Sequence, residues 1–391
     1  MTASQRIETA LRRGIPDRVP FVPKIWVDFG ARWLGVEIER VIQDPCTALE
    51  VILRTGVDFG LDGVRQFAFP ARHTAWRDGR LFELTAAGRR IGPIDLDGGL
   101  QTQLSDVSDF GLSDPVAMTY FHYRHAPLPV LNRMADVRAI AVPEPPLLDE
   151  LGFNRNQKEV CKRVETSCAG RAMPALIQDC GPIGMAFYVA FNGMNKALLD
   201  LFDQPRLVHA ALDRGDRIAV ARGTYWLNQG YRILRINDSA GNMSVLSPQH
   251  WRSFIKPHFT AVAAELHRAC PDALLYCHIC GNVLPILDDL VDTGLDCIGP
   301  LDPLGGMSVA ESASVVAGRT ALMGGINTLS FVNSDPMDVQ REALACIQGA
   351  RAAAGCEAVP PGFVLGSGCV MPRDASPPNI RAAAEAVVRK T

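Results

Sequence analysis

The sequence "LLYCHICG", residues 274–281, joins an apolar run to three side chains that bind soft metals. The run reads as a buried strand that ends at Gly281. Side chains alternate along an extended strand, so His278 and Cys280 point to one face, whereas Cys277 points to the other. The stretch therefore predicts a strand of a covered sheet with two metal-binding side chains at its carboxyl end.

Seven other short apolar runs share this character, because each ends in Gly, Asn, Asp or Cys and helical patterns usually separate them. These runs cover 19–25, 58–64, 175–180, 233–238, 297–302, 321–327 and 362–368. Strands that alternate with helices predict an α/β fold with a parallel sheet covered on both faces. Eight strands predict a single (β/α)8 TIM barrel, and a doubly wound sheet is the alternative.

Three helices have clear start signals in the sequence. An N-terminal extension begins with a helix whose capping box joins Thr2 and Gln5 and which stops at Gly14. Two later helices begin at Ser247 and Ser334, each with a proline in the first turn. These helices fit the connections of a barrel.

Residues 66–170 interrupt the repeat of strand and helix. The segment "WRDGRLFELTAAGRRIGPI", residues 76–94, reads as a β excursion punctuated by glycine, and Pro-rich loops follow it. We expect this region to be an insertion, or lid, that covers the C-terminal mouth of one barrel domain formed by residues 1–391.

The composition excludes several classes of protein. The chain has 48% hydrophobic and 21% charged residues and a net charge of -3, with no polybasic stripe for nucleic acid. No segment reaches the roughly 20 apolar residues of a membrane span, and the start lacks the apolar core of a secretory signal. We therefore expect a cytoplasmic enzyme, in which the 11 cysteines stay reduced.

A third metal-binding side chain follows the last predicted strand. Cys369 lies in "LGSGCVMP", residues 365–372, and the carboxyl ends of barrel strands meet at one mouth. Two thiolates and one imidazole suit Zn²⁺, and three protein ligands leave one position open for a reactant. His278, Cys280 and Cys369 are thus the predicted zinc ligands, whereas a closed structural zinc in a non-enzymatic binding protein is an alternative.

Several segments carry a resemblance to a known family. They are "RGIPDRVPFVP", "DCGPIGMAFYVAFNG", "INDSAGNMSVLSP", "HICGNVLPILDDLVDTGLDCIGPLDP" and "LGSGCVMPRDASPPNIRAAAEAV". Together they resemble the uroporphyrinogen decarboxylase superfamily and, within it, the zinc-dependent corrinoid methyltransferases such as methylcobamide:coenzyme M methyltransferase. The family's zinc triad falls on the same His278, Cys280 and Cys369.

The decarboxylase branch of that superfamily fits less well. Its members carry an Arg-Gln-Ala-Gly-Arg stretch after the first strand, and here the corresponding residues 24–35 read "KIWVDFGARWLG". A porphyrinogen with many carboxylates needs such cations. A uroporphyrinogen-type decarboxylase is therefore kept as an alternative function.

The resemblance implies methyl transfer between a corrinoid and a small methyl donor or acceptor, such as a thiol, a methoxy compound or an amine. None of the eight histidines lies two residues after an aspartate, as the family's corrinoid domains require, so cobalamin is expected free or on a separate corrinoid protein. Related barrels often pair, which leaves a homodimer open.

Other polar residues follow the predicted strands. We expect Asn237 and Asp238 to act in catalysis, with Asp238 orienting His278 or moving a proton. A cap on the following loop is the alternative for Asp238. The residues expected to bind substrate are Lys24, Trp26, Asp179 and Asn327.

Overall fold

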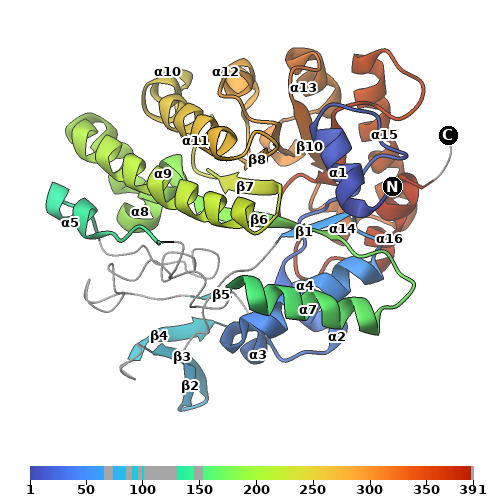
Figure 1. Cartoon of the computed structure of the whole chain (residues 1–391), viewed down its shortest axis with the longest axis horizontal. Helices are drawn as coiled ribbons and strands as arrows, with labels where there is room; N and C mark the ends of the chain where they lie inside the picture. The colour runs from blue at the N-terminus through green and yellow to red at the C-terminus, as the bar shows by residue number, and fades with distance from the viewer. Residues whose placement is uncertain (66–73, 85–89, 96–98, 101–129, 145–152, 389–391) are drawn as a thin grey trace.

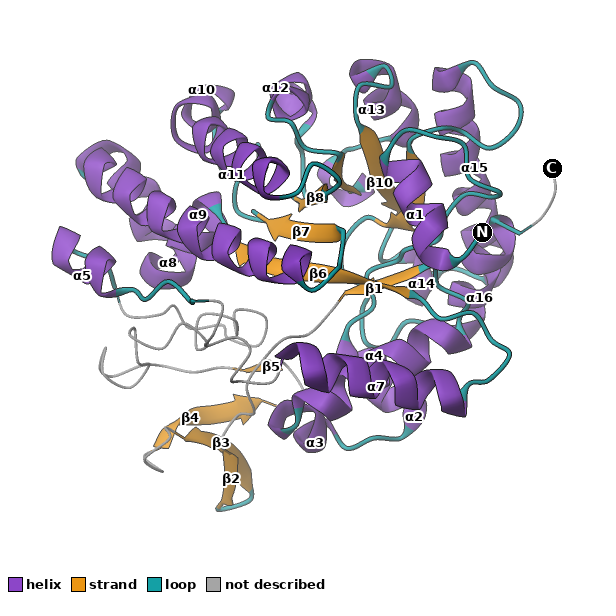
Figure 2. Cartoon of the chain, in the orientation of Figure 1, coloured by secondary structure: helices purple, strands orange, loops and turns teal. Residues whose placement is uncertain are grey.

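The computed structural model describes residues 1–65, 74–84, 90–95, 99–100, 130–144 and 153–388. It shows an α/β fold in which seven parallel strands form one curled sheet, in the order β1-β6-β7-β8-β9-β10-β11 (Figure 1). Helices cover the outer face of this sheet (Figure 2). The predicted class and the parallel sheet are confirmed.

The elements follow one another along the chain with short connections. The strands of the main sheet are β1 Gly63–Arg65, β6 Ala175–Pro182, β7 Ile233–Asn237, β8 Leu274–His278, β9 Cys297–Leu301, β10 Ala321–Ile326 and β11 Phe363–Ser367. The helices before β7 are α1 Ala3–Leu11, α2 Val27–Leu34, α3 Ile38–Gln43, α4 Pro45–Asp58, α5 Met134–Ala139, α7 Phe153–Ser167, α8 Gly184–Asp203 and α9 Pro205–Asn228. Those after β7 are α10 Pro248–His250, α11 Lys256–Ala269, α12 Leu287–Asp292, α13 Val309–Val316, α14 Ser330–Asn333, α15 Pro336–Ala354 and α16 Pro377–Ala386.

The run 19–25 is not a regular strand, so this part of the sequence prediction is wrong. It makes two isolated parallel bridges, Phe21 with Leu365 and Lys24 with Val370. Two prolines interrupt it, and because proline has no N–H to donate, a continuous ladder of hydrogen bonds cannot form. Seven of the eight predicted runs contain strands of the main sheet.

The same run nevertheless lies between β11 and β1. The N–H of Leu365 donates to the carbonyl of Pro20 at 2.9 Å, and the N–H of Asp62 donates to the carbonyl of Phe21 at 2.8 Å. The segment thus contacts β11 on one side and the residue before β1 on the other. β1 is shorter than the predicted run 58–64, because α4 extends to Asp58.

The predicted helix starts agree with the structure to within one residue. The capping box of Thr2 and Gln5 opens α1, and the Ser247 side chain caps α10 by accepting from His250 N–H at 3.2 Å. The helix expected from Ser334 has Asp335 as its N-cap instead. The Asp335 carboxylate accepts from the N–H three residues later, which the serine does not.

A small apolar cluster fills the inside of the curled sheet at the amino ends of its strands. First residues of several strands belong to it, including Ala175, Ile233 and Leu274. Ile7 and Leu11 of α1 join the same cluster, so α1 closes this end. The carboxyl ends of the strands, at the opposite end of the sheet, are left for a site.

A second, antiparallel sheet lies within the predicted insertion 66–170. It has four strands in the order β2-β3-β4-β5, at Thr74–Arg77, Arg80–Leu84, Arg90–Asp95 and Gly99–Leu100. This confirms the β excursion. Residues 66–73, 85–89, 96–98, 101–129 and 145–152 lie outside the described residues, so the lid and the single-domain boundaries stay predictions. Among the described residues, no helix combines the length and the apolarity that a membrane crossing needs.

Asp62 is the buried carboxylate that ties the N-terminal segment to the sheet. Its side chain is 3% exposed and accepts from Arg6 Nη1 at 2.6 Å and from both terminal nitrogens of Arg18 at 2.7 and 2.9 Å. The N–H of Phe21 donates to the same carboxylate at 2.8 Å. Two guanidinium groups and one amide therefore compensate one buried charge.

We predict that Asp62→Asn lowers the free energy of unfolding by about 3 kcal/mol, because it leaves two arginines without their buried anion. Urea unfolding followed by circular dichroism measures this loss. Asp17→Asn is the matched control, since Asp17 also pairs with Arg6 but its side chain is 41% exposed. It should cost about 1 kcal/mol or less. Equal losses for the two variants would contradict the anchoring role of Asp62.

Candidate metal centre

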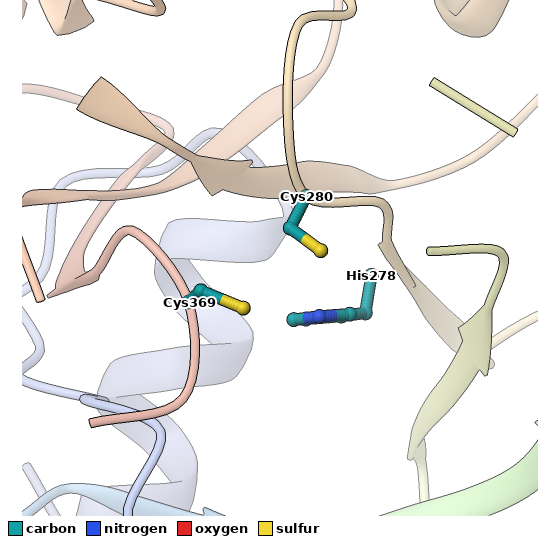
Figure 3. Close-up of side chains that lie close together, drawn as sticks. All are labelled: His278, Cys280 and Cys369. Carbon is teal, nitrogen blue, oxygen red and sulfur yellow. The ribbon is translucent and has the colours of Figure 1, made fainter. Parts of the chain in front are cut away.

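The structure brings together the three predicted metal ligands. His278 is the last residue of β8, Cys280 follows two residues later, and Cys369 lies two residues after β11. One ligand atom from each residue lies within 4.8 Å of the other two. Figure 3 shows the three side chains pointing toward one another from two separate segments of the chain. Residues 89 positions apart thus share one site, as strands of a curled sheet allow.

The two thiols interact directly. Their hydrogen bond lowers the pKa of Cys369 and raises the pKa of Cys280, which means that the pair holds one proton between two sulfurs. The positive charge of Lys24 favours the thiolate form of both. The Val370 N–H also donates to the Cys369 sulfur. One thiolate is therefore already prepared for a cation at neutral pH.

The imidazole of His278 has different neighbours at its two nitrogens. The Lys24 ammonium lies 2.7 Å from Nε2, and the Tyr276 hydroxyl lies 3.2 Å from Nδ1. A hydrogen bond from Nδ1–H to Tyr276 keeps a lone pair on Nε2, where Lys24 now donates. His278 is 1% exposed, so bulk water does not compete for its ring nitrogens. The contacts with Lys24 and Tyr276 therefore set its tautomer.

A chain of polar contacts links two other predicted residues to the thiols. Arg235, which is 1% exposed, donates to Asp179 Oδ2 and to Asn237 Oδ1, both at 2.8 Å. The Ser239 hydroxyl donates to Asn237 Oδ1 at 2.9 Å and also lies within hydrogen-bond reach of the Cys280 sulfur. The side chains of Asp179 and Asn237 are thus linked to the Cys280 sulfur through Arg235 and Ser239.

The remaining predicted site residues lie elsewhere or contact other groups. Asp238 is fully buried, and its Oδ1 accepts from Ala186 N–H at 2.7 Å, at the start of α8. Burial raises its pKa to about 7 although backbone N–H groups oppose this shift. Its position matches the capping alternative, and the ring partners of His278 are other residues. Asn327 accepts from Leu329 N–H and donates its own N–H to Glu342.

Trp26 is the N-cap residue of α2 and is half-buried, two residues after Lys24. A cavity of about 20 Å³, enough for roughly one water-sized group, lies between Lys24, Tyr276, His278 and Ser367. The site therefore combines a sulfur and nitrogen cluster with a small enclosed space.

Four contributing residues were not predicted from the sequence: Tyr276, Arg235, Ser239 and Ser367. Tyr276 has the same strand parity as His278, and this signal could have found it. Ser367 accepts from Lys24 N–H at 2.8 Å and donates to the Cys369 carbonyl at 2.6 Å. Ser367 thereby connects the backbone of Lys24 to the loop that carries Cys369.

The donor set fits a zinc ion by its chemistry. Two sulfurs and one imidazole nitrogen are ligands that Zn²⁺ prefers, and three of them can form a catalytic site with an open position. Two thiolates with a neutral imidazole carry a charge of -2, which a divalent cation cancels. His278, Cys280 and Cys369 are therefore compatible with the zinc ion that the family resemblance implies.

Comparison with known proteins places the chain in a family. A family profile described as "Uroporphyrinogen decarboxylase (URO-D)" matches residues 120–389, which is more than half of the chain. The chain belongs to the uroporphyrinogen decarboxylase family. This family membership confirms the resemblance predicted from the sequence motifs.

Relatives of this uroporphyrinogen decarboxylase family member include two archaeal methyltransferases. Methylcobamide:CoM methyltransferase MtaA of Methanosarcina barkeri is 27% identical over 151 residues, which are 38% of this chain and 41% of the relative. The methylated-thiol–coenzyme M methyltransferase of Methanosarcina mazei is 26% identical over 144 residues, 37% of each chain. The matched segment spans about two fifths of the relatives' length. The predicted similarity to methylcobamide:coenzyme M methyltransferase is confirmed.

A solved structure of a methyltransferase from Methanosarcina mazei superposes on nearly the whole molecule. The TM-score is 0.68 at 16% sequence identity, with 99% of this chain and 98% of the other covered. At this identity the likeness shows a common fold, which covers nearly the whole of this chain.

We predict that Cys369→Ser removes about one equivalent of zinc relative to the unmodified chain, because a serine hydroxyl is a poor replacement for a thiolate ligand. Elemental analysis after dialysis measures the metal. Cys277→Ala is the matched control, since Cys277 lies in the same strand as His278 but faces the outer apolar cluster. Loss of zinc from the control, or retention by the Cys369 variant, would refute the assignment.

A pH dependence of metal binding follows from the shared proton. Because the pKa of Cys280 is raised, the metal-free chain keeps this thiol proton at neutral pH, and binding must expel it. We expect zinc affinity to rise by about tenfold per pH unit between about pH 6.5 and 8.5. Competition with a chelator of known pH behaviour measures the slope. A flat profile would show that no thiol proton is displaced.

Proposed function

We propose that this protein is a zinc-dependent methyltransferase that moves a methyl group between a corrinoid and a small methyl donor or acceptor. The observation that carries the proposal is the convergence of His278, Cys280 and Cys369 at the carboxyl ends of β8 and β11. The names of both relatives describe methyl transfer with coenzyme M, and one also includes methylcobamide. This support comes from similarity over part of the chain.

A zinc ion held by these residues would act as a Lewis acid that lowers the pKa of a bound thiol or polarises a methylated heteroatom. The chain's own residues prepare this chemistry. Tyr276 fixes the tautomer of His278, and Ser239 and the Val370 N–H share the negative charge of the two sulfurs. Such outer hydrogen bonds set both the orientation and the basicity of metal ligands.

Lys24 supplies a positive charge beside the cavity. Its ammonium contacts His278 and acts on both sulfurs, so an acceptor that binds as a thiolate would meet a favourable potential there. We propose that Lys24 and Trp26 bind substrate. Asp179 and Asn237 are proposed to act through Arg235 and Ser239, whereas the contacts of Asp238 and Asn327 favour structural roles over the predicted ones.

The co-substrate is proposed to be cobalamin, free or delivered by a separate corrinoid protein. The residues 1–391 are proposed to form one domain that acts in the cytoplasm, and a homodimer is left for measurement. Methyl transfer in both directions is compatible with the donor set, since the same Lewis acidity serves a thiol acceptor and a methoxy or amine donor.

The deciding experiment mixes zinc-loaded protein with methylcobalamin and a panel of thiols, and mixes it with cob(I)alamin and methylated donors. We expect a change of the cobalamin absorbance with at least one partner, and a rate at least about 100-fold lower for Cys280→Ser, because this change removes a thiolate ligand. Cys277→Ala should keep the rate of the unmodified chain to within a few fold.

Two outcomes would favour the alternatives. A folded, metal-free preparation that retains the full rate would remove the zinc-dependent mechanism, and release of carbon dioxide from a uroporphyrinogen by that preparation would support the decarboxylase. A tightly bound zinc with four protein ligands and no exchangeable position would support the non-enzymatic binding protein.

A further inference from the structure

A second group of metal-binding side chains lies far from β11, between two helices of the outer layer. α9 and α11 pack against each other outside the sheet (Figure 1). His209, Asp213 and Asp216 are spaced by four and three residues along α9, which places them on one helical face. His258 lies on α11. Neither helix contributes a residue to the His278 centre.

These side chains lie within the reach of one cation. Asp216 Oδ2 is 2.6 Å and Asp213 Oδ1 is 3.6 Å from Nδ1 of His258. One ligand atom from each of the three residues lies within 4.8 Å of the other two. Two carboxylates and one imidazole from two helices therefore surround a single point.

The second oxygen of Asp216 provides an independent indication that something is bound here. Asp216 is 8% exposed, and its Oδ1 is buried without a hydrogen-bond partner. A buried carboxylate oxygen that no donor contacts is costly, and native proteins usually pair such atoms. A cation between the two carboxylates would compensate this oxygen without any new protein donor.

Asp216 has two negatively charged neighbours, Asp213 and Glu265, and one partner that can carry a positive charge, His258. Burial raises the pKa of Asp216, the hydrogen bond and charge of His258 oppose this effect, and the charges of Asp213 and Glu265 add to it. Within the described part of the chain, the ion pairs of Asp213 and Asp216 involve His258 and no lysine or arginine. A divalent cation would therefore offset the excess of negative charge around Asp216.

His209 holds the ring of His258 in a suitable orientation. Its Nδ1 lies 3.4 Å from His258 Nε2, and its own ring stacks on Phe254 with the centroids 4.8 Å apart. Without a cation, the 2.6 Å contact of His258 Nδ1 with Asp216 is a hydrogen bond from Nδ1–H to the carboxylate. A cation would take the place of this proton, and His258 would then donate from Nε2–H to His209. Metal-bound histidines usually donate their other N–H in this way.

We propose that Asp213, Asp216 and His258 form a second metal site for a first-row divalent transition metal, with His209 as the residue that positions His258. Carboxylate and imidazole ligands suit such ions, and Zn²⁺ is the probe we choose. Binding would join α9 to α11 directly. The proposal stands on these helices alone and does not depend on the proposed function.

The test is a Zn²⁺ titration of the metal-free full chain by calorimetry, with metal counting after dialysis. The unmodified chain should bind two equivalents, and Cys280→Ser/Cys369→Ser should bind one. Asp213→Asn should weaken the second site by at least about tenfold, since it removes one of three ligands. Its side chain is 65% exposed, so this variant leaves the helix packing intact.

Asp272→Asn is the matched control, because Asp272 is also an exposed carboxylate, at 78%, but lies outside the cluster. It should bind Zn²⁺ like the unmodified chain. In the double cysteine variant, Zn²⁺ should raise the melting temperature, and Asp213→Asn should abolish that rise. No Zn²⁺ binding by the double cysteine variant, or equal affinities for Asp213→Asn and Asp272→Asn, would overturn the proposal.

Discussion

The site depends on the position of the short segment between β11 and β1. Its backbone is held by the hydrogen bonds of Pro20 with Leu365 and of Phe21 with Asp62. The carbonyl of Lys24 accepts from Met371 N–H at 3.0 Å, which fixes the loop that carries Cys369. One irregular segment thus sets both the ammonium beside His278 and the turn that presents the third ligand. A regular strand has no proline in its interior and would not bend in this way. It would therefore not bring Lys24 to His278 and also hold the Cys369 loop.

The electrostatics of the site follow from this backbone arrangement. The positive charge of Lys24 favours the thiolate form of both thiols, and its ammonium also contacts the buried imidazole of His278. An ammonium is a monovalent point charge, whereas the full set of ligands carries two negative charges when both thiols ionise. A divalent cation would therefore be the better match for this set of ligands.

The sequence could predict the metal ligands because they obey simple rules. The alternation of side chains placed His278 and Cys280 on one face, and the meeting of parallel strand ends brought Cys369 to them. The same rules could not resolve Asp238, which has the opposite parity to Asn237 and turns toward the start of α8. These rules also could not identify Arg235, because the sequence does not show which residue a charged side chain inside an apolar strand pairs with. The apolar character of 19–25 favoured a strand, and its two prolines explain why the structure has only isolated bridges there.

The buried carboxylates of this protein are compensated in three different ways. Asp62 has two arginines, whereas Asp238 has several backbone N–H groups but, like Asp216, one buried oxygen without a hydrogen-bond partner. Asp216 has one histidine, an unpaired oxygen and two further carboxylates nearby. Proteins rarely leave a buried charge so poorly matched, since desolvation of an ion is costly. What distinguishes Asp216 from both Asp62 and Asp238 is the additional negative charge of Asp213 and Glu265, which a cation bound between α9 and α11 would offset.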